Sequence, residues 1–284
     1  MIAAIILNYN SSQDCKECIA DLKRQSVPIR IIVVDNCSKG DDSKQLEYFC
    51  QQTDCTFIQA DANRGYNAGN NIGIRYAIEL GCEYILISNP DMRYTDKEFV
   101  SKLVAKMKED SEIVAIGGNI LGLDGKPQSP MKRDGGWKDS FDWIGGLLNP
   151  KRNKEQRNYL DHPESSHYCS KLMGSCLMVK GSYMKSIGFF DEGVFLYCEE
   201  AILSRQIESD GKKMFFLKEA ECVHAHKSGE KGDPVKRFRN WKLSRHYFID
   251  KYSGDSKLGR TIAKASMSLY VYTFFLAAKL KHRQ

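Results

Sequence analysis

The sequence predicts an α/β fold with a Rossmann-like, mostly parallel central sheet, and three observations support this prediction. Short apolar runs typical of buried strands alternate with longer polar, helix-like segments through the first third of the chain. Two of these runs, Ile31–Val34 and Tyr84–Ile87, end in turns that carry carboxylates, Asp35 and Asp91. A glycine-rich turn, Asn63–Gly73, precedes a further helix. Because α/β sheets bind nucleotides at the carboxyl ends of their strands, the two carboxylates mark a candidate site.

In the first half, strands and helices are expected in regular alternation. The expected strands are Ile2–Leu7, Ile31–Val34, Thr56–Gln59, Tyr84–Ile87 and Ile113–Gly117. The expected helices lie near Ser12–Gln25, Asp42–Gln52, Asn70–Leu80 and Thr95–Glu109. Such alternation implies right-handed crossovers that place helices on the faces of the sheet. Residues 1–118 are therefore interpreted as a nucleotide-binding half.

The second half begins with a long irregular stretch, Gly122 to His167, which contains Trp137 among many Gly, Pro, Lys and Asp residues. Irregular segments of this length in compact domains are usually functional. Regular structure is expected to return in two strands, Cys176–Val179 and Lys213–Leu217, and in helices near Ser182–Ser186 and from Glu199 to Ser209. We expect one domain over 1–230, with 119–230 as its acceptor-binding and catalytic half, followed by a C-terminal helical extension over 231–284.

Composition narrows the class of partner. The chain has 284 residues and a formal net charge of +6, from 42 Lys and Arg against 36 Asp and Glu. This modest excess suits phosphate-bearing small molecules or an anionic membrane surface. No zinc-finger spacing or RNA-binding aromatic signature is present, so no nucleic acid partner is expected. The chain opens on a strand-like segment without a signal sequence, and its 10 cysteines are interpreted as reduced, cytoplasmic thiols. The lone Cys15-x-x-Cys18 pair is interpreted as ordinary helix residues.

Seven short motifs follow one another along the chain, and this ordered set resembles the inverting family 2 glycosyltransferases, especially their rhamnosyltransferase-like subgroup. Each motif is weak alone, whereas the ordered set is specific. The motifs are Ile5–Asn10, Val33–Ser38, Asn63–Gly73, Asn89–Asp91, Gly174–Met178, Gly188–Glu192 and Phe195–Glu200. This resemblance implies the GT-A fold, a nucleotide-sugar donor and a divalent metal ion.

The resemblance also implies a donor-binding set at the edge of the sheet. Asp35 would contact the base or ribose of the nucleotide, although it could instead cap a helix. Glycines in the Asn63–Gly73 segment would let the backbone approach the ligand, and the following helix would direct its N-terminal amides toward bound charge. The expected donor-binding residues are Asn8, Asn10, Asp35, Asn36, Asn63, Gly65, Asn67, Gly69 and Asn89.

Asp91 is the expected protein ligand of Mg²⁺ or Mn²⁺, which would stabilise the leaving diphosphate as a Lewis acid. Asn89-Pro90-Asp91 stands where the resembled family has a D-x-D motif, so Asp91 is the one full carboxylate there. The alternative is a simple turn that ends a strand. By the same resemblance a late histidine supplies a second ligand, for which His224 is preferred and His226 is the alternative.

Inverting transfer needs a carboxylate to take the proton of the acceptor hydroxyl. The resemblance assigns this role to Glu200, although relatives carry Glu-Asp where this chain has Glu199-Glu200. Glu199 is the alternative base, and if Glu200 is the base, Glu199 is expected to contact the acceptor. A purely structural interpretation is that both glutamates are solvated at the start of a helix. Asp191 and Trp137 are further expected acceptor contacts, with Asp191 alternatively holding the preceding turn.

The C-terminal part favours transfer of a single sugar, because the Q-x-x-R-W motif of processive synthases is absent from the sequence. Between Thr261 and Lys281 apolar residues and lysines mix, as in an interfacial helix at the inner face of the plasma membrane. Packing on the domain or in a homodimer is the alternative.

The expected activity is transfer of L-rhamnose from dTDP-L-rhamnose to a lipid-linked saccharide in the synthesis of a bacterial surface polysaccharide, such as O antigen or cell wall. UDP-galactose or UDP-glucose remain alternative donors. The departures at Asn89 and Glu200 also leave open a catalytically silent nucleotide-sugar-binding subunit. A dinucleotide-dependent oxidoreductase is disfavoured, because the first strand ends in Asn8-Tyr9-Asn10 rather than in a glycine fingerprint.

Overall fold

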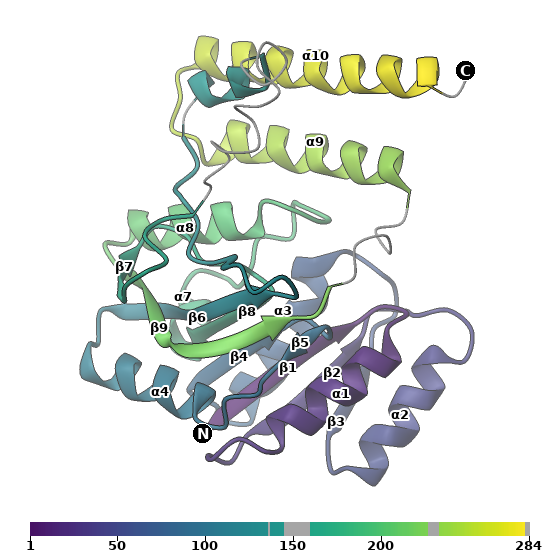
Figure 1. The fold of residues 1–284 in the computed structure, drawn as a ribbon, viewed down its shortest axis with the longest axis vertical. Coiled ribbons are helices and arrows are strands. Elements are labelled where there is room, and N and C mark those ends of the chain that lie inside the picture. Colours follow the sequence, from purple (N-terminus) through teal and green to yellow (C-terminus); the bar gives the residue numbers. More distant parts are fainter. Residues whose placement is uncertain (136, 145–159, 227–232, 282–284) are drawn as a thin grey trace.

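A computed structural model describes the chain except residues 136, 145–159, 227–232 and 282–284 (Figure 1). Within the described residues one sheet has the strand order β3-β2-β1-β4-β8-β6-β9-β5, and β7 pairs with β9. The strands are β1 (Ile2–Asn8), β2 (Arg30–Asp35), β3 (Thr56–Gln59), β4 (Tyr84–Ser88), β5 (Met92–Arg93), β6 (Ile113–Gly122), β7 (His167–Cys169), β8 (Cys176–Lys180) and β9 (Lys213–His224). The helices are α1 (Ser12–Leu22), α2 (Asp42–Gln52), α3 (Tyr66–Glu79), α4 (Phe99–Glu109), η1 (Trp137–Phe141), α7 (Gly181–Ser186), α8 (Glu199–Ser209), α9 (Pro234–Lys251) and α10 (Lys257–Lys281).

The first four strands are parallel, as the alternation of strands and helices predicts. β1 lies between β2 and β4, and β2 pairs with β3. The register sets Asn8 opposite Asp35 and Asp35 opposite Gln59, so these polar residues meet at the carboxyl edge of the sheet. β8 then runs antiparallel between β4 and β6. The arrangement is thus the α/β fold with a mostly parallel central sheet that the sequence predicts.

Each face of the sheet carries its own apolar core. Because successive side chains of a strand point to opposite faces, Ala4 and Ile6 of β1 pack with α1, α2 and α4, whereas Ala3 and Ile5 pack with α3, α7 and α8. Figure 1 shows these helices on the two sides of the sheet. Cys15 and Cys18 are buried free thiols of α1, which confirms that they are ordinary helix residues.

A third apolar cluster joins the C-terminal helices to α8. Val194, Ala201 and Ile202 pack there with Phe248 of α9 and Met267 of α10. Figure 1 shows α9 and α10 lying one above the other beyond α8. Among the helices that the structure describes, none is both long enough and apolar enough to span a membrane.

Several elements differ from their predicted bounds; for example, α4 begins at Phe99 rather than near Thr95, and β6 continues past Gly117 to Gly122. α3 begins at Tyr66 rather than near Asn70, because the Gly69 N–H already bonds to the Gly65 carbonyl. β9 continues past Leu217 to His224, since a bulge between Gly118 and Asn119 lets it stay paired with β6. The irregular stretch contains η1, and its residues 145–159 lie outside the described part.

Candidate active site

Asn8 and Asp35 form the centre of a buried hydrogen-bond network at the carboxyl edge. The Asn8 Nδ2 atom donates to Asp35 Oδ1 at 2.7 Å and to Asp42 Oδ2 at 2.8 Å. Asp35 Oδ2 accepts from the Ser38 N–H at 2.9 Å and from Gln59 Nε2 at 2.8 Å. Asp35 therefore shapes this edge and does not cap α2, whose N-cap residue is Asp41. Sequence reasoning missed Asp42 and Gln59, although both lie at the ends of expected elements.

Further expected donor residues lie near this network. Asn36 Nδ2 donates to Asn63 Oδ1 at 3.2 Å and to the Gly65 carbonyl at 3.3 Å. Asn10 is exposed at the mouth of the edge, with φ of 54°. The side-chain oxygens of Asn36 and Asn67 are buried without a hydrogen-bond partner among the described residues. Since a buried unpaired oxygen is unfavourable, both positions suit a bound donor group or water.

Gly65 and Gly69 are needed for close packing within the protein. Gly65 has φ of +103°, and a Cβ there would lie 2.2 Å from the Phe195 carbonyl oxygen. The Tyr66 N–H donates to that same oxygen at 2.8 Å. A Cβ on Gly69 would lie 2.5 Å from Leu7. Asn67 also faces the second half of the chain, where its Nδ2 donates to the Asp191 carbonyl at 2.7 Å. This segment thus joins the nucleotide edge to the loop before α8.

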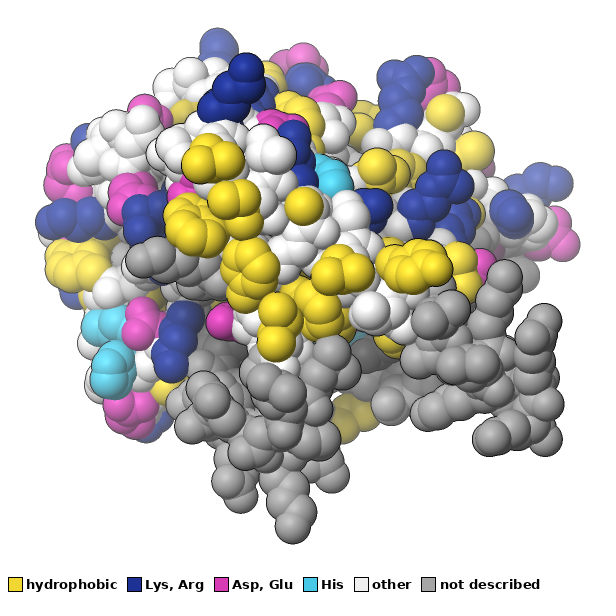
Figure 2. All heavy atoms as spheres, turned by 90° about the horizontal axis from the view of Figure 1, so that it is seen from above, with side chains coloured by type: hydrophobic (Ala, Val, Ile, Leu, Met, Phe, Trp, Pro, Cys, Tyr) yellow, Lys and Arg dark blue, Asp and Glu magenta, His cyan; other side chains and the backbone are white. Residues whose placement is uncertain are grey.

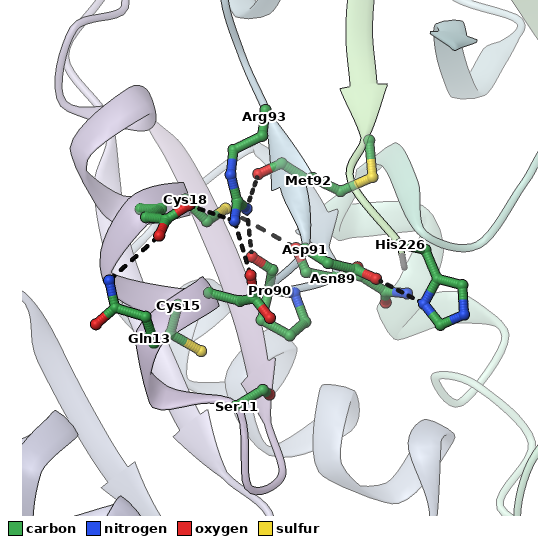
Figure 3. A network of polar contacts seen from close by, with 12 residues as sticks. Ser11, Gln13, Cys15, Cys18, Asn89, Pro90, Asp91, Met92, Arg93 and His226 are labelled. Carbon is green, nitrogen blue, oxygen red and sulfur yellow. Dashed lines mark hydrogen bonds and ion pairs between the residues drawn. The ribbon is translucent and has the colours of Figure 1, made fainter. Parts of the chain in front are cut away.

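Asp91, His224 and His226 bring three potential metal ligands together. Asp91 Oδ2 lies 3.2 Å from His224 Nε2 and 3.4 Å from His226 Nδ1, and Figure 3 shows Asp91 and His226 pointing toward one another. The pairing of β5 with the end of β9 produces this arrangement, because Met92 lies opposite His224 and the Ala225 N–H bonds to the Asp91 carbonyl. Both histidines therefore meet Asp91, where the sequence prediction preferred one.

The donor set fits a divalent metal. Asp91 Oδ1 is buried without a partner among the residues that the structure describes. Burial would raise the pKa of Asp91, but the hydrogen bond from His224 and the charges of both histidines lower it. His224 Nδ1 lies 2.8 Å from Gln128 Oε1, which orients the ring so that Nε2 faces Asp91. Carboxylate and imidazole groups both ligate divalent metal ions in proteins.

Arg93 fixes the turn that carries Asp91. Its guanidinium donates to Asp14 Oδ1 at 2.7 Å, to Glu17 Oε2 at 2.6 Å and to the Pro90 carbonyl at 3.1 Å. Figure 3 shows these contacts of Arg93, which connect β5 to α1. The turn is also bonded to the segment just before β8, because the Asn89 N–H donates to the Ser175 carbonyl at 2.8 Å. Nothing in the sequence around Arg93 predicted this contact.

Glu199 and Glu200 occupy the first turn of α8. Tyr197 and Cys198 before them have φ of 73° and 69°, a left-handed conformation that costs energy for residues other than glycine. Glu200 Oε1 accepts from the Gly174 N–H at 3.2 Å. Glu199 Oε2 is buried and finds no partner within the described residues. The pair is therefore not two solvated glutamates.

Burial raises the pKa of both carboxyl groups, and the charge of Glu200 raises that of Glu199 further. A raised pKa makes a carboxylate a stronger base near neutral pH. Glu200 contacts Gly174, and the next residue, Ser175, holds Asn89. Glu200 is thereby linked, through the segment just before β8, to the turn that carries Asp91.

Asp191 is engaged by α9 and the residue after it. Its carboxylate accepts from Tyr247 at 2.9 Å, from Lys251 at 2.7 Å and from the Tyr252 hydroxyl. Burial opposes ionisation, yet these donors, Lys251 first, lower the pKa of Asp191 to about 2. Asp191 therefore joins the loop before α8 to α9, and whether it contacts the acceptor stays a prediction. Trp137, the other expected acceptor contact, lies in η1 and packs against Gly259 of α10. A Cβ atom added to Gly259 would lie 3.0 Å from the Trp137 ring.

Comparisons with known proteins identify the family of the chain. The family described as "Glycosyl transferase family 2" matches residues 3–176. The low-salt glycan biosynthesis hexosyltransferase Agl10 of Haloferax volcanii is 32% identical over 200 residues, which are 70% of this chain and 59% of that protein. The N-acetylglucosaminyl-diphospho-decaprenol L-rhamnosyltransferase of Mycobacterium tuberculosis is 23% identical over 89% of this chain and 86% of its own. Among solved structures, a Pyrobaculum calidifontis mannosyltransferase with GDP-Man and Mn²⁺ has a TM-score of 0.61 at 15% identity, covering 98% of this chain and 75% of its own.

Proposed function

The chain belongs to glycosyl transferase family 2, and we propose that this glycosyltransferase transfers one L-rhamnose from dTDP-L-rhamnose to a lipid-linked saccharide. The observation that carries the proposal is that Asp91, His224 and His226 lie together, while Glu200 is linked to the turn of Asp91 through the segment just before β8. Relatives named as rhamnosyltransferases, at 22–24% identity over most of the chain, support the choice of sugar.

Asp91, His224 and His226 would hold the divalent ion, Mg²⁺ or Mn²⁺. When bound, this ion would stabilise the negative charge that grows on the leaving diphosphate. Arg93 would act indirectly, since its contact with the Pro90 carbonyl holds the turn in place. Asn8, Asp35 and Asn36 would shape the pocket for the nucleotide, and the unpaired Asn36 oxygen would accept a donor hydrogen bond.

Glu200 would remove the proton of the acceptor hydroxyl. As that oxygen bonds to the anomeric carbon, the bond from this carbon to the diphosphate oxygen breaks and the configuration inverts. The contact of Glu200 with Gly174 on the β8 side favours it over Glu199, which has no such link to the metal turn. The complete set of Asp91, two histidines and a half-buried glutamate pair weighs against a catalytically silent subunit.

The surface of α10 supports contact with the cytoplasmic face of a membrane. Leu258, Leu269 and Tyr272 are 70%, 52% and 63% exposed and follow a helical spacing along one side of α10. Figure 2 looks onto this side of the molecule and shows hydrophobic side chains gathered there with Lys and Arg around them. Such a surface suits the headgroup region of an anionic bilayer. The same stripe could serve a homodimer, which sedimentation of the protein with and without anionic vesicles would reveal.

The second candidate donor is UDP-galactose or UDP-glucose, favoured by the 32% identity to a protein named as a hexosyltransferase. We would measure nucleoside diphosphate release with Mn²⁺, the candidate donors and lipid-linked saccharide extracts. Release from one donor should fall by at least about 100-fold in Glu200→Gln. Glu208→Gln, an exposed change in the same helix, should keep normal activity. Undiminished release by Glu200→Gln would refute the proposed base.

A further inference from the structure

An aromatic groove lies between α9, α10 and the segment before α8. It has a volume of about 270 Å³ and is lined by Tyr197, Arg237, Phe238, Trp241 and Tyr270. The rings of Phe238, Trp241 and Tyr270 stand 6.0 to 6.2 Å apart, centroid to centroid. These rings come from two helices, so the groove exists only because the C-terminal extension packs as a pair.

Arg237 is the cation of this groove. Its Nε atom is buried, and no described residue accepts a hydrogen bond from it. Other cations of the same helix are engaged, since Arg245 pairs with Asp134 at 2.8 Å and Lys251 with Asp191 at 2.7 Å. A buried guanidinium nitrogen without an acceptor is unfavourable, and an anion that enters the groove would supply one.

The groove lies next to the proposed base. Tyr197 is two residues before Glu199 in the chain, and the Ser244 hydroxyl of α9 donates to the Leu196 carbonyl at 2.7 Å. Burial raises the pKa of Tyr197, while Arg237 acts to lower it and Glu199 to raise it. Tyr197 therefore lines the groove beside Arg237 and is also close enough to Glu199 to feel its charge.

We propose that this groove binds an isoprenoid diphosphate, the lipid-carrier part of the acceptor, with its phosphate oxygens on Arg237 and its first isoprene units against Phe238, Trp241 and Tyr270. This inference rests on the proposed function. The saccharide on the diphosphate then passes Tyr197 and reaches Glu199 and Glu200. Guanidinium groups bind phosphate through paired hydrogen bonds, and aromatic faces bury an apolar chain. The groove would thus bind the lipid diphosphate end of the acceptor, and the saccharide end would lie at the base.

The test is calorimetric binding of farnesyl diphosphate to the full chain in EDTA, so that no metal supports binding at the nucleotide edge. We expect Arg237→Gln to weaken binding at least tenfold, and Trp241→Leu to weaken it by a similar factor. Arg239→Gln removes an exposed cation of the same helix and should stay within twofold of the wild type. Nucleoside diphosphate binding with Mn²⁺ should be unchanged in all three variants, which also shows that they are folded.

Two results would overturn the proposal. One is equal binding of farnesyl diphosphate by the wild type and Arg237→Gln. The other is binding of inorganic diphosphate as tight as that of farnesyl diphosphate, which would mean that the aromatic walls contribute nothing. Because this assay needs no sugar transfer, its result is independent of the proposed activity. If farnesyl diphosphate binding depends on Arg237 but no sugar transfer is seen, the proposed activity is rejected and the groove proposal stands. If sugar is transferred but farnesyl diphosphate binding does not depend on Arg237, the groove proposal is rejected and the activity stands.

Discussion

Glu199→Gln should stabilise the protein, and the gain should depend on pH. Burial and the neighbouring Glu200 raise the pKa of the Glu199 carboxyl in the folded state above its unfolded value of about 4.5. Below that value both states are protonated and the carboxyl group costs nothing. As the pH rises, the unfolded state ionises first, so the free energy of unfolding of the wild type falls until the folded pKa is passed. Glutamine does not ionise and avoids this loss.

The size of the gain follows from linkage. Each pKa unit between the folded and unfolded states corresponds to about 1.4 kcal/mol. At roughly 2–4 °C per kcal/mol for a domain of this size, one unit raises Tm of the variant by roughly 3–5 °C. We would record thermal unfolding of wild type and Glu199→Gln from pH 3.5 to 8, and we expect the difference in Tm to be near zero at pH 3.5 and to grow as the pH rises.

Glu208→Gln is the matched control of opposite sign. Hydrogen bonds from Arg133 and Arg205 lower the pKa of Glu208, so its ionised form favours folding above the unfolded pKa. Since this side chain is 53% exposed, its loss should cost less than about 1 kcal/mol at pH 8 and nothing at low pH. A Glu199→Gln variant that is less stable than the wild type at pH 8, or a gain that grows on acidification, would refute the reasoning.

Three further predictions concern the metal, a glycine and the link to α9. Mn²⁺ at about 100 times its Kd should stabilise the wild type by about 2.7 kcal/mol in thermal unfolding, and Asp91→Asn should lose most of this gain; an equal gain in both proteins would exclude Asp91 as a ligand. Gly65→Ala should cost more than about 3 kcal/mol in urea unfolding, because its Cβ would meet the Phe195 carbonyl, whereas Gly40→Ala, at φ of +64° in open space, should cost only about 1–2 kcal/mol. Asp191→Asn should lower the free energy of unfolding by about 1–2 kcal/mol at pH 7, a loss that disappears as the pH falls from 3.8 toward 2, and a loss independent of pH would contradict the ion-pair explanation.

The sequence predicted the parallel half of the fold well, because its strands are short apolar runs bounded by polar turns. It also identified Asp91 as a candidate metal ligand, because a short motif directly after a strand end suffices to select it. The approach of both His224 and His226 to Asp91 was not predictable in the same way. It depends on a long-range pairing of β5 with a strand that continues seven residues beyond its expected end, Leu217.

The least predictable features are contacts between distant segments. Gly65 was interpreted as a ligand-binding glycine, yet it is the Phe195 backbone that occupies the space beside it. Asp191 lies within a recognisable motif, but its partners are contributed by residues 247–252, about 60 positions later. Periodicity and local motifs carry no information about such pairs. The candidate acceptor groove is of the same kind, since no single segment contains more than three of its residues.

The direct backbone contact between Tyr66 and Phe195 has a consequence for the order of events in a catalytic cycle. A nucleotide bound against the Asn63–Gly73 segment would act, through this contact, on the loop that contains Phe195. Four residues after Phe195 this loop leads into α8, which begins with Glu199 and Glu200. Because Gly65 leaves no spare room at this contact, the two segments must shift together. We therefore expect sequential kinetics in which the donor binds first, and donor binding sets the final position of the base. The base would then be in its catalytic position only when donor is bound, which limits hydrolysis of the donor by water before the acceptor binds.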